Sequence, residues 1–227
     1  MAVHSSPRAH HEPRWHAALA VLGAAALQFF LPPRLSLGPA WVLPLIVLAM
    51  LVPLLVFSPS RHEETKLQRA WSIALIAVVN LFNLASVLLL VFHIVHPQLH
   101  AVVGTQLLVA GGQIWLSNVL VFGLWFWEID GGGPEPRSHA HSEAELRDVD
   151  FLFPQMTLSG NKARCIDATW KPLFLDYLYV AFTNALAFSP TDTMPLTRSA
   201  KMLMLLESGI SFVAIAVVVS RSINIIS

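Results

Sequence analysis

The stretch "DYLYVAFTNALAFSPTDTMPLT" runs from Asp176 to Thr197, and an apolar run follows it almost to the end of the sequence. It begins as an apolar, aromatic helix and ends in two prolines and three threonines around one acid, Asp192. The helical part, Pro172 to Phe188, has about 17 residues, whereas about 20 are needed to cross the hydrocarbon of a membrane. We therefore predict a half-length re-entrant helix followed by irregular chain, with a complete span as the alternative.

The composition places this stretch in a membrane protein. Hydrophobic residues make up 55% of the 227 residues and charged residues only 12%, against about 25% charged residues in ordinary soluble domains. So few charges cannot cover a water-facing surface, so a lipid bilayer is the expected partner. The net charge of zero gives no electrostatic footprint for nucleic acid, and one cysteine, Cys165, excludes an internal disulfide framework.

Five other stretches are long and apolar enough to cross a bilayer: Trp15–Leu31, Leu37–Phe57, Ala70–Val95, Ala101–Trp127 and Ala200–Ile225. The sequence therefore predicts an all-α integral membrane fold with five transmembrane helices plus a re-entrant helix, or six transmembrane helices if the opening stretch spans. Prolines and Arg34, not a small-residue cleavage site, follow the first stretch, so we interpret it as a retained helix.

Polar segments divide the chain into four regions. Residues 1–14 form a His-rich tail, residues 15–127 a four-helix membrane region, residues 128–171 a polar loop, and residues 172–227 the short helix, its loop and the last apolar helix. The polar loop carries one apolar patch, "FLFPQ" at Phe151–Gln155. We expect this patch to dock either on the membrane interface or on the helix bundle.

Motifs of catalysis are missing. HExxH, the P-loop pattern, GxSxG and paired CxxC do not occur, so we predict neither an enzyme nor a cofactor or metal site. His93, His96 and His100 have the spacing of one helix face, and imidazoles so placed could bind zinc. Pro97 interrupts that run, so we favour a helix end at the membrane surface.

Polar residues inside the apolar stretches need partners in hydrocarbon. Asn83 and Asn118 belong to a set that we expect to join neighbouring helices, in preference to lining a conduction path. Glu207 lies about two turns into the last stretch, where a buried carboxylate is costly. We expect Glu207 to pair with Lys201, with Arg198 or with another subunit, or else to face water.

The opening stretch resembles the pore region of the tetrameric cation channels of the potassium-channel superfamily. The resemblance covers about 55 residues. Asp192, Pro195 and Thr197 reproduce the tail Asp-x-x-Pro-x-Thr without a gap, Thr183 falls on a pore-helix threonine, and Tyr179 falls on an aromatic position. The resemblance implies a pore helix, a filter segment and an inner helix from Ala200 to Ile225, with Gly209 near a hinge glycine.

The filter segment departs from that family. In place of TVGYG the chain has Ala187, Phe188, Ser189, Pro190 and Thr191. Potassium filters aim backbone carbonyls at the ion, their glycines permit the required dihedrals, and a proline fixes φ near −65°. We therefore expect a channel-like homo-oligomer, a tetramer by the resemblance, that conducts monovalent or divalent cations without potassium selectivity. The pore-lining candidates are Thr183, Asn184, Ser189, Pro190, Thr191 and Asp192, and the inner-helix candidates are Glu207 and Gly209. A non-conducting scaffold or a small-solute transporter is the alternative.

The distribution of Lys and Arg indicates an orientation. Ten of these residues fall in the N-terminal tail, the second connection and the long loop, whereas the opposite side has Arg34 alone. The positive-inside rule then predicts a cytoplasmic N-terminus. The whole chain also looks like uncharacterised bacterial multi-pass membrane families, which implies a bacterial inner membrane. A hairpin entering from the long loop would be cytoplasmic, whereas the channels place theirs outside.

Overall fold

The structure is a computed structural model that describes residues 15–56, 66–96, 104–139, 149–157, 170–189 and 192–226. It is mostly helical, which confirms the predicted all-α class. The longer helices are α1 (Trp15–Phe29), α2 (Val42–Val56), α3 (Lys66–Val95), α4 (Gly104–Ile129), α6 (Phe174–Ala187) and α7 (Arg198–Ile226). A short 3-10 helix, η1 (Pro33–Leu35), lies between α1 and α2.

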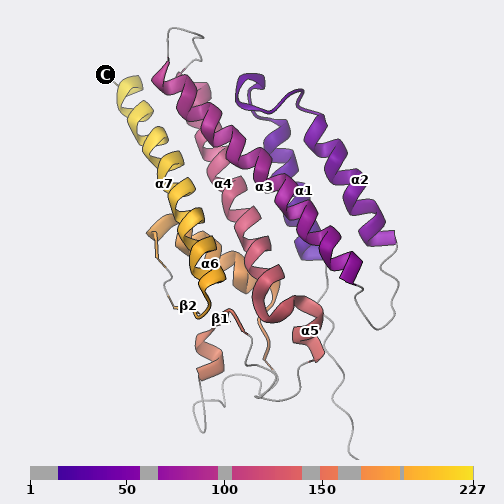
Figure 1. Ribbon diagram of the computed structural model, residues 1–227. Coiled ribbons are helices and arrows are strands. Elements are labelled where there is room, and N and C mark those ends of the chain that lie inside the picture. The colour runs from indigo at the N-terminus through magenta and orange to yellow at the C-terminus, as the bar shows by residue number, and fades with distance from the viewer. Residues whose placement is uncertain are drawn as a thin grey trace, which may run out of the picture.

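Helix α4 is the centre of the bundle, because it packs against α1, α3, α6 and α7 (Figure 1). Two glycines of α4 allow the closest approaches. A Cβ at Gly111 would lie 2.6 Å from a methyl group of Val218 on α7, and a Cβ at Gly123 would lie 3.2 Å from the Cα of Leu178 on α6. Small residues at such contacts let helices pack backbone to backbone, as they do in membrane bundles.

Three helices are long and apolar enough to cross a membrane: Lys66–Val95, Thr105–Gly132 and Arg198–Ser220. Helices α1 and α2 have 15 residues each. At 1.5 Å per residue each is about 22 Å long, which is less than the hydrocarbon thickness of about 30 Å. The chain is therefore compatible with a membrane protein of at least these three spans, and the count of five stays a prediction.

Helices α6 and α7 run parallel and begin at the same end of the bundle. Tyr177 in the first turn of α6 binds Asp130 at the end of α4, and Thr197 just before α7 binds Asp150, whose N–H also binds Asp130. The last turn of α6 ends beside the middle of α7, where the rings of Phe188 and Phe212 lie 5.8 Å apart. Figure 1 shows α6 beside the half of α7 that adjoins β1 and β2.

The lengths of the two helices agree with this arrangement. Helix α6 has 14 residues, about 21 Å, and Phe212 lies 14 residues beyond the start of α7, again about 21 Å. The ten residues from 188 to 197 must return over that distance, and an extended chain of ten residues reaches about 33 Å. Residues 174–197, called the hairpin below, thus enter the bundle and leave it at one end.

The loop of residues 128–171 differs from the predicted polar loop in the parts that the structure describes. It contains η2 (Asp130–Gly132), α5 (Pro134–His139), β1 (Phe151–Leu152) and η4 (Pro154–Thr157). Strand β1 pairs antiparallel with β2 (Met194–Pro195), with Phe151 opposite Pro195. Phe151 and Phe153 are buried, and the rings of both contact Tyr177. Of the two expected positions for the apolar patch, the structure therefore shows the one on the helix bundle.

Candidate functional site

Both ends of the hairpin meet at a polar cluster, called the hairpin base here, which consists of the buried Asp130, Arg137, Asp150 and Tyr177 and the half-buried Thr197. The carboxylate of Asp130 accepts hydrogen bonds from the N–H groups of Asp150 and Phe151, at 2.6 and 3.1 Å, and from the hydroxyl of Tyr177. Asp150 in turn accepts from the hydroxyls of Thr197 and Ser199. Two carboxylates therefore fix α4, α6 and the start of α7 to one another.

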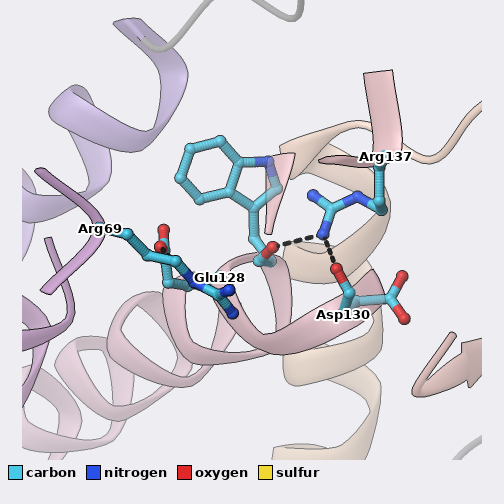
Figure 2. A network of polar contacts seen from close by, with 5 residues as sticks. Arg69, Glu128, Asp130 and Arg137 are labelled. Atoms are coloured by element: carbon cyan, nitrogen blue, oxygen red, sulfur yellow. Dashed lines mark hydrogen bonds and ion pairs between the residues drawn. The ribbon is translucent and has the colours of Figure 1, made fainter. Parts of the chain in front are cut away.

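Arg137 closes the hairpin base from the side of α5. Its Nη1 donates to the carbonyl of Trp127 at 2.8 Å and to the carbonyl of Asp130, as Figure 2 shows. The guanidinium carbon also lies 5.0 Å from the centre of the Tyr177 ring, within the range of a cation–π contact. Lys171 donates to the carbonyl of Arg137 at 2.9 Å, and partial burial lowers the pKa of the Lys171 ammonium.

The turn that brings Arg137 back beneath α4 depends on three glycines. Gly131, Gly132 and Gly133 have φ values of 56°, 80° and 108°, which residues with a side chain adopt only at a cost. A Cβ at Gly131 would also lie 2.9 Å from Cγ of Arg137. On the other side of the α4 terminus Glu128 faces Arg69 of α3, with 4.0 Å between Oε1 and Nε (Figure 2).

A second polar cluster lies deeper in the bundle, where α6 crosses α4 and α7. The Glu207 cluster consists of five buried residues: Asn83, Asn118, Asn184, Glu207 and Ser211. Nδ2 of Asn184 donates to Oε2 of Glu207 at 2.6 Å and to the carbonyl of Met204 at 3.0 Å. Within the chain the partner of Glu207 is thus a neutral amide and not Lys201, Arg198 or water, because Glu207 is 0% exposed and both cations are exposed. Pairing with another subunit stays a prediction.

Amides from α3 and α4 continue the Glu207 cluster. Nδ2 of Asn118 donates to Oγ of Ser211 at 2.9 Å and to the carbonyl of Glu207 at 3.1 Å. Nδ2 of Asn83 donates to Oδ1 of Asn118 at 3.4 Å. Asn83 and Asn118 therefore join α3, α4 and α7, as predicted for polar residues inside apolar helices.

The predicted pore-lining residues fall into two groups. Asn184 is buried against Glu207, whereas Thr183 is half-buried and donates to the carbonyls of Tyr179 and Val180 in its own helix. Ser189 and Asp192 are exposed, and the inner-helix candidate Gly209 is exposed as well. Pro190 and Thr191 lie outside the described residues. The structure thus separates the buried Asn184 from an exposed set, with Thr183 between them in exposure.

The residues that carry the resemblance also have local structural roles. Thr197 is the residue before α7, and its Oγ1 accepts from the N–H of Ala200 at 3.3 Å, as an N-cap does. Pro195 lies in β2, and its lack of a backbone N–H is tolerated there because β2 is an edge strand. Asp176 in the first turn of α6 accepts from the N–H of Leu173 at 2.7 Å, so it caps the helix and complements its dipole.

The histidine run gives no metal centre in the part of the chain that the structure describes. His93 and His96 each place Nδ1 near a carbonyl of their own helix, those of Leu89 and Phe92, at 2.8 and 3.2 Å. His100 lies outside the described residues. Among the described residues no three His, Cys, Asp or Glu side chains gather as metal ligands.

Sequence reasoning missed the hairpin base. Its bonds join residues far apart along the chain, such as Asp130 and Tyr177, and two of its donors are the backbone N–H groups of Asp150 and Phe151. The one sign of it in the sequence was an acid at the end of an apolar run, directly before three glycines.

Comparison of the chain with known protein families, curated proteins and solved structures finds no match.

Proposed function

We propose that this chain is an ion-channel-like membrane protein that conducts cations without selecting potassium. The observation that carries the proposal is the hairpin, in which a 14-residue helix and the following helix enter the bundle from one end. Backbone that turns back inside a membrane is tolerated only where protein or water covers it. A water-filled path beside residues 188–197 provides that cover.

The proposed topology has five crossing helices and a re-entrant α6. Helix α6 is too short to cross about 30 Å of hydrocarbon, and its return segment makes a second crossing unnecessary. We also count α1 and α2 as membrane-crossing helices, because apolar residues beyond their ends lengthen each apolar stretch. These residues are Phe30 and Leu31 after α1 and Trp41 before α2.

The tip of the hairpin supports a functional role for this segment. Phe188 ends α6 with φ of 56°, a left-handed conformation that costs a residue with a side chain about 1–2 kcal/mol. Strained backbone of this kind gathers at functional sites. Ser189 and Asp192 are exposed, so copies of the chain placed around an axis would form a ring of acids, which favours cations.

Orientation follows from the basic residues around the hairpin base. Arg69, Arg137, Lys171, Arg198 and Lys201 belong to segments that begin or end there. Ala17 near the start of α1 lines the same cavity as Trp127 and Glu128 at the end of α4, so α1 begins at this end too. By the positive-inside rule this end and the N-terminus face the cytoplasm of a bacterial inner membrane.

A second candidate function has one observation in its favour. Asn184 and Glu207, two of the candidates for the ion path, are buried inside the protomer, as they would be in a protein without a central pore. The alternative is therefore a non-conducting scaffold or a small-solute transporter with a pore-like hairpin.

The test is ion flux into liposomes that contain the purified protein, together with the mass of the assembled particle. We expect an oligomer that passes cations, and we expect Asp192→Asn to reduce cation flux several-fold by removing the ring of acids. Glu135→Gln, which removes an acid of α5 outside the hairpin, is the matched control and should retain flux. A strictly monomeric protein without flux would refute the channel and leave the alternative.

A further inference from the structure

The carboxyl group of Glu207 is the one acid of the bundle interior that contacts only neutral groups in the described residues. Its side chain is 0% exposed. Oε2 accepts from Asn184 at 2.6 Å, and Oε1 has no hydrogen-bond partner. The buried acids near the hairpin base differ from it, because Asp130 has three donors and Glu128 faces Arg69.

The groups that face Glu207 from each packed helix are uncharged. Helix α6 contributes Asn184, and α4 contributes Asn118, which binds the backbone carbonyl of Glu207. On α7 itself, the flanking groups are Met204 and Ser211, while Lys201 is exposed. An ionised carboxylate would therefore stand unneutralised in an apolar bundle, which is unfavourable.

A proton relieves this cost with the groups that are present. A neutral acid keeps Oε2 as the carbonyl oxygen, which accepts the Asn184 bond, and places its proton on the unpartnered Oε1. A bound metal cation would instead require several oxygen ligands. The buried oxygens without a partner in this cluster are Oε1 of Glu207 and Oδ1 of Asn83, which are too few for such a shell.

We propose that Glu207 is a proton-binding site inside each protomer, and that its proton keeps the hairpin seated on α7. With the proton bound, the Asn184 amide bonds a neutral acid and α6 packs closely. When the proton leaves, the carboxylate draws in water, and the contact between α6 and α7 loosens. The seated hairpin is therefore favoured at low pH and is released as the pH rises. The site does not depend on ion conduction.

The first test is infrared spectroscopy of the purified protein in lipid across a pH titration. We expect a carboxylic-acid C=O band that disappears as the pH rises and that is missing from Glu207→Gln at every pH. The midpoint should be the same in sodium and in a large organic cation. A midpoint that moves with sodium concentration would show a metal-cation site, and the absence of any such band assigned to Glu207 would show a permanent carboxylate. Either result overturns the proposal.

The second test measures the position of the hairpin. Ser189→Cys, made together with Cys165→Ser, gives one thiol at the exposed tip for labelling with a maleimide. The rate of labelling should rise with pH more steeply than in the same protein carrying Glu207→Gln. That variant carries the same thiol, so the comparison corrects for ionisation of the thiol itself. Asn184→Leu, which removes the amide without touching the acid, should label rapidly at all pH values. Identical pH profiles with and without Glu207 would refute a proton-held hairpin, whatever the flux assay gives.

Discussion

The hydroxyl of Tyr177 donates a hydrogen bond to the carboxylate of Asp130, and this bond anchors α6 to the end of α4. The substitution Tyr177→Phe removes that bond alone. The ring contacts should persist, because the edge-on contacts with Phe151 and Phe153 and the cation–π contact with Arg137 do not involve the oxygen. The lost bond goes to a carboxylate, and hydrogen bonds to charged groups contribute about 1.5–3 kcal/mol. Asp130 keeps its two backbone donors.

That free energy corresponds to a measurable change in local opening. Since 1.4 kcal/mol is a factor of ten, the opening of the first turns of α6 should become about 10- to 150-fold more frequent. Amide hydrogen exchange in lipid nanodiscs reports such local opening directly. We expect α6 amides to lose protection by this factor, while the middle of α4 keeps its protection.

The matched control lies two residues further along the same helix. Tyr179 is 51% exposed, so Tyr179→Phe removes an equivalent hydroxyl from a surface position and should change stability by less than about 0.5 kcal/mol. If Tyr177→Phe leaves α6 exchange within twofold of wild type, the bond to Asp130 does not anchor the hairpin. Equal losses in both variants would mean that any change on α6 loosens it.

Two further substitutions test the packing and the capping of α7. Gly111→Ala should destabilise the protein by about 1–3 kcal/mol in a chemical unfolding assay in micelles, because the new Cβ would lie 2.6 Å from a methyl group of the stiff, β-branched Val218. Gly112→Ala, whose Cβ would meet nothing within 4 Å, is its control and should be neutral or slightly stabilising. Thr197→Ala should cost about 1 kcal/mol in the same assay, since it removes the α7 cap and the bond to Asp150, and Thr197→Ser should restore most of the loss. Retained stability in Thr197→Ala would show that the cap does not hold the start of α7.

The helices were predictable from the sequence because apolar runs of that length have few other structures available in lipid. The expected stretch Ala70–Val95 lies within α3, and the expected Ala200–Ile225 lies within α7. The short helix was also predictable, since Pro172–Phe188 became α6 with two residues fewer at its start and one fewer at its end. Length and hydrophobicity are local properties, so they can be read from one segment at a time.

The polar clusters were not predictable in the same way, because each bond depends on the packing of distant segments. Glu207 was expected to find a cation, another subunit or water, and its partner within the chain is Asn184, which lies on another helix. Asp130 satisfies backbone donors of the long loop, whose apolar patch was expected to dock on the membrane interface or on the bundle, without a partner being identifiable. Asn83 and Asn118 were correctly expected to join helices, but the sequence gives no means of choosing their partners.

The two clusters hold the hairpin by different physical means, and this difference decides which part of it can move. The hairpin base combines carboxylates with backbone N–H groups, a hydroxyl and a guanidinium, so its bonds are charge-assisted and need no change of protonation. The tip is held by the bond from Asn184 to Glu207, seven residues or about 10 Å further along α6 than Tyr177. Loss of the Glu207 proton leaves an unneutralised charge among apolar helices, which disfavours close packing at the tip, while the base keeps its bonds. A hairpin fastened in this way is expected to pivot about its base, and the exposed Ser189 beside its tip should make a larger movement than Asp192, which lies two residues before β2.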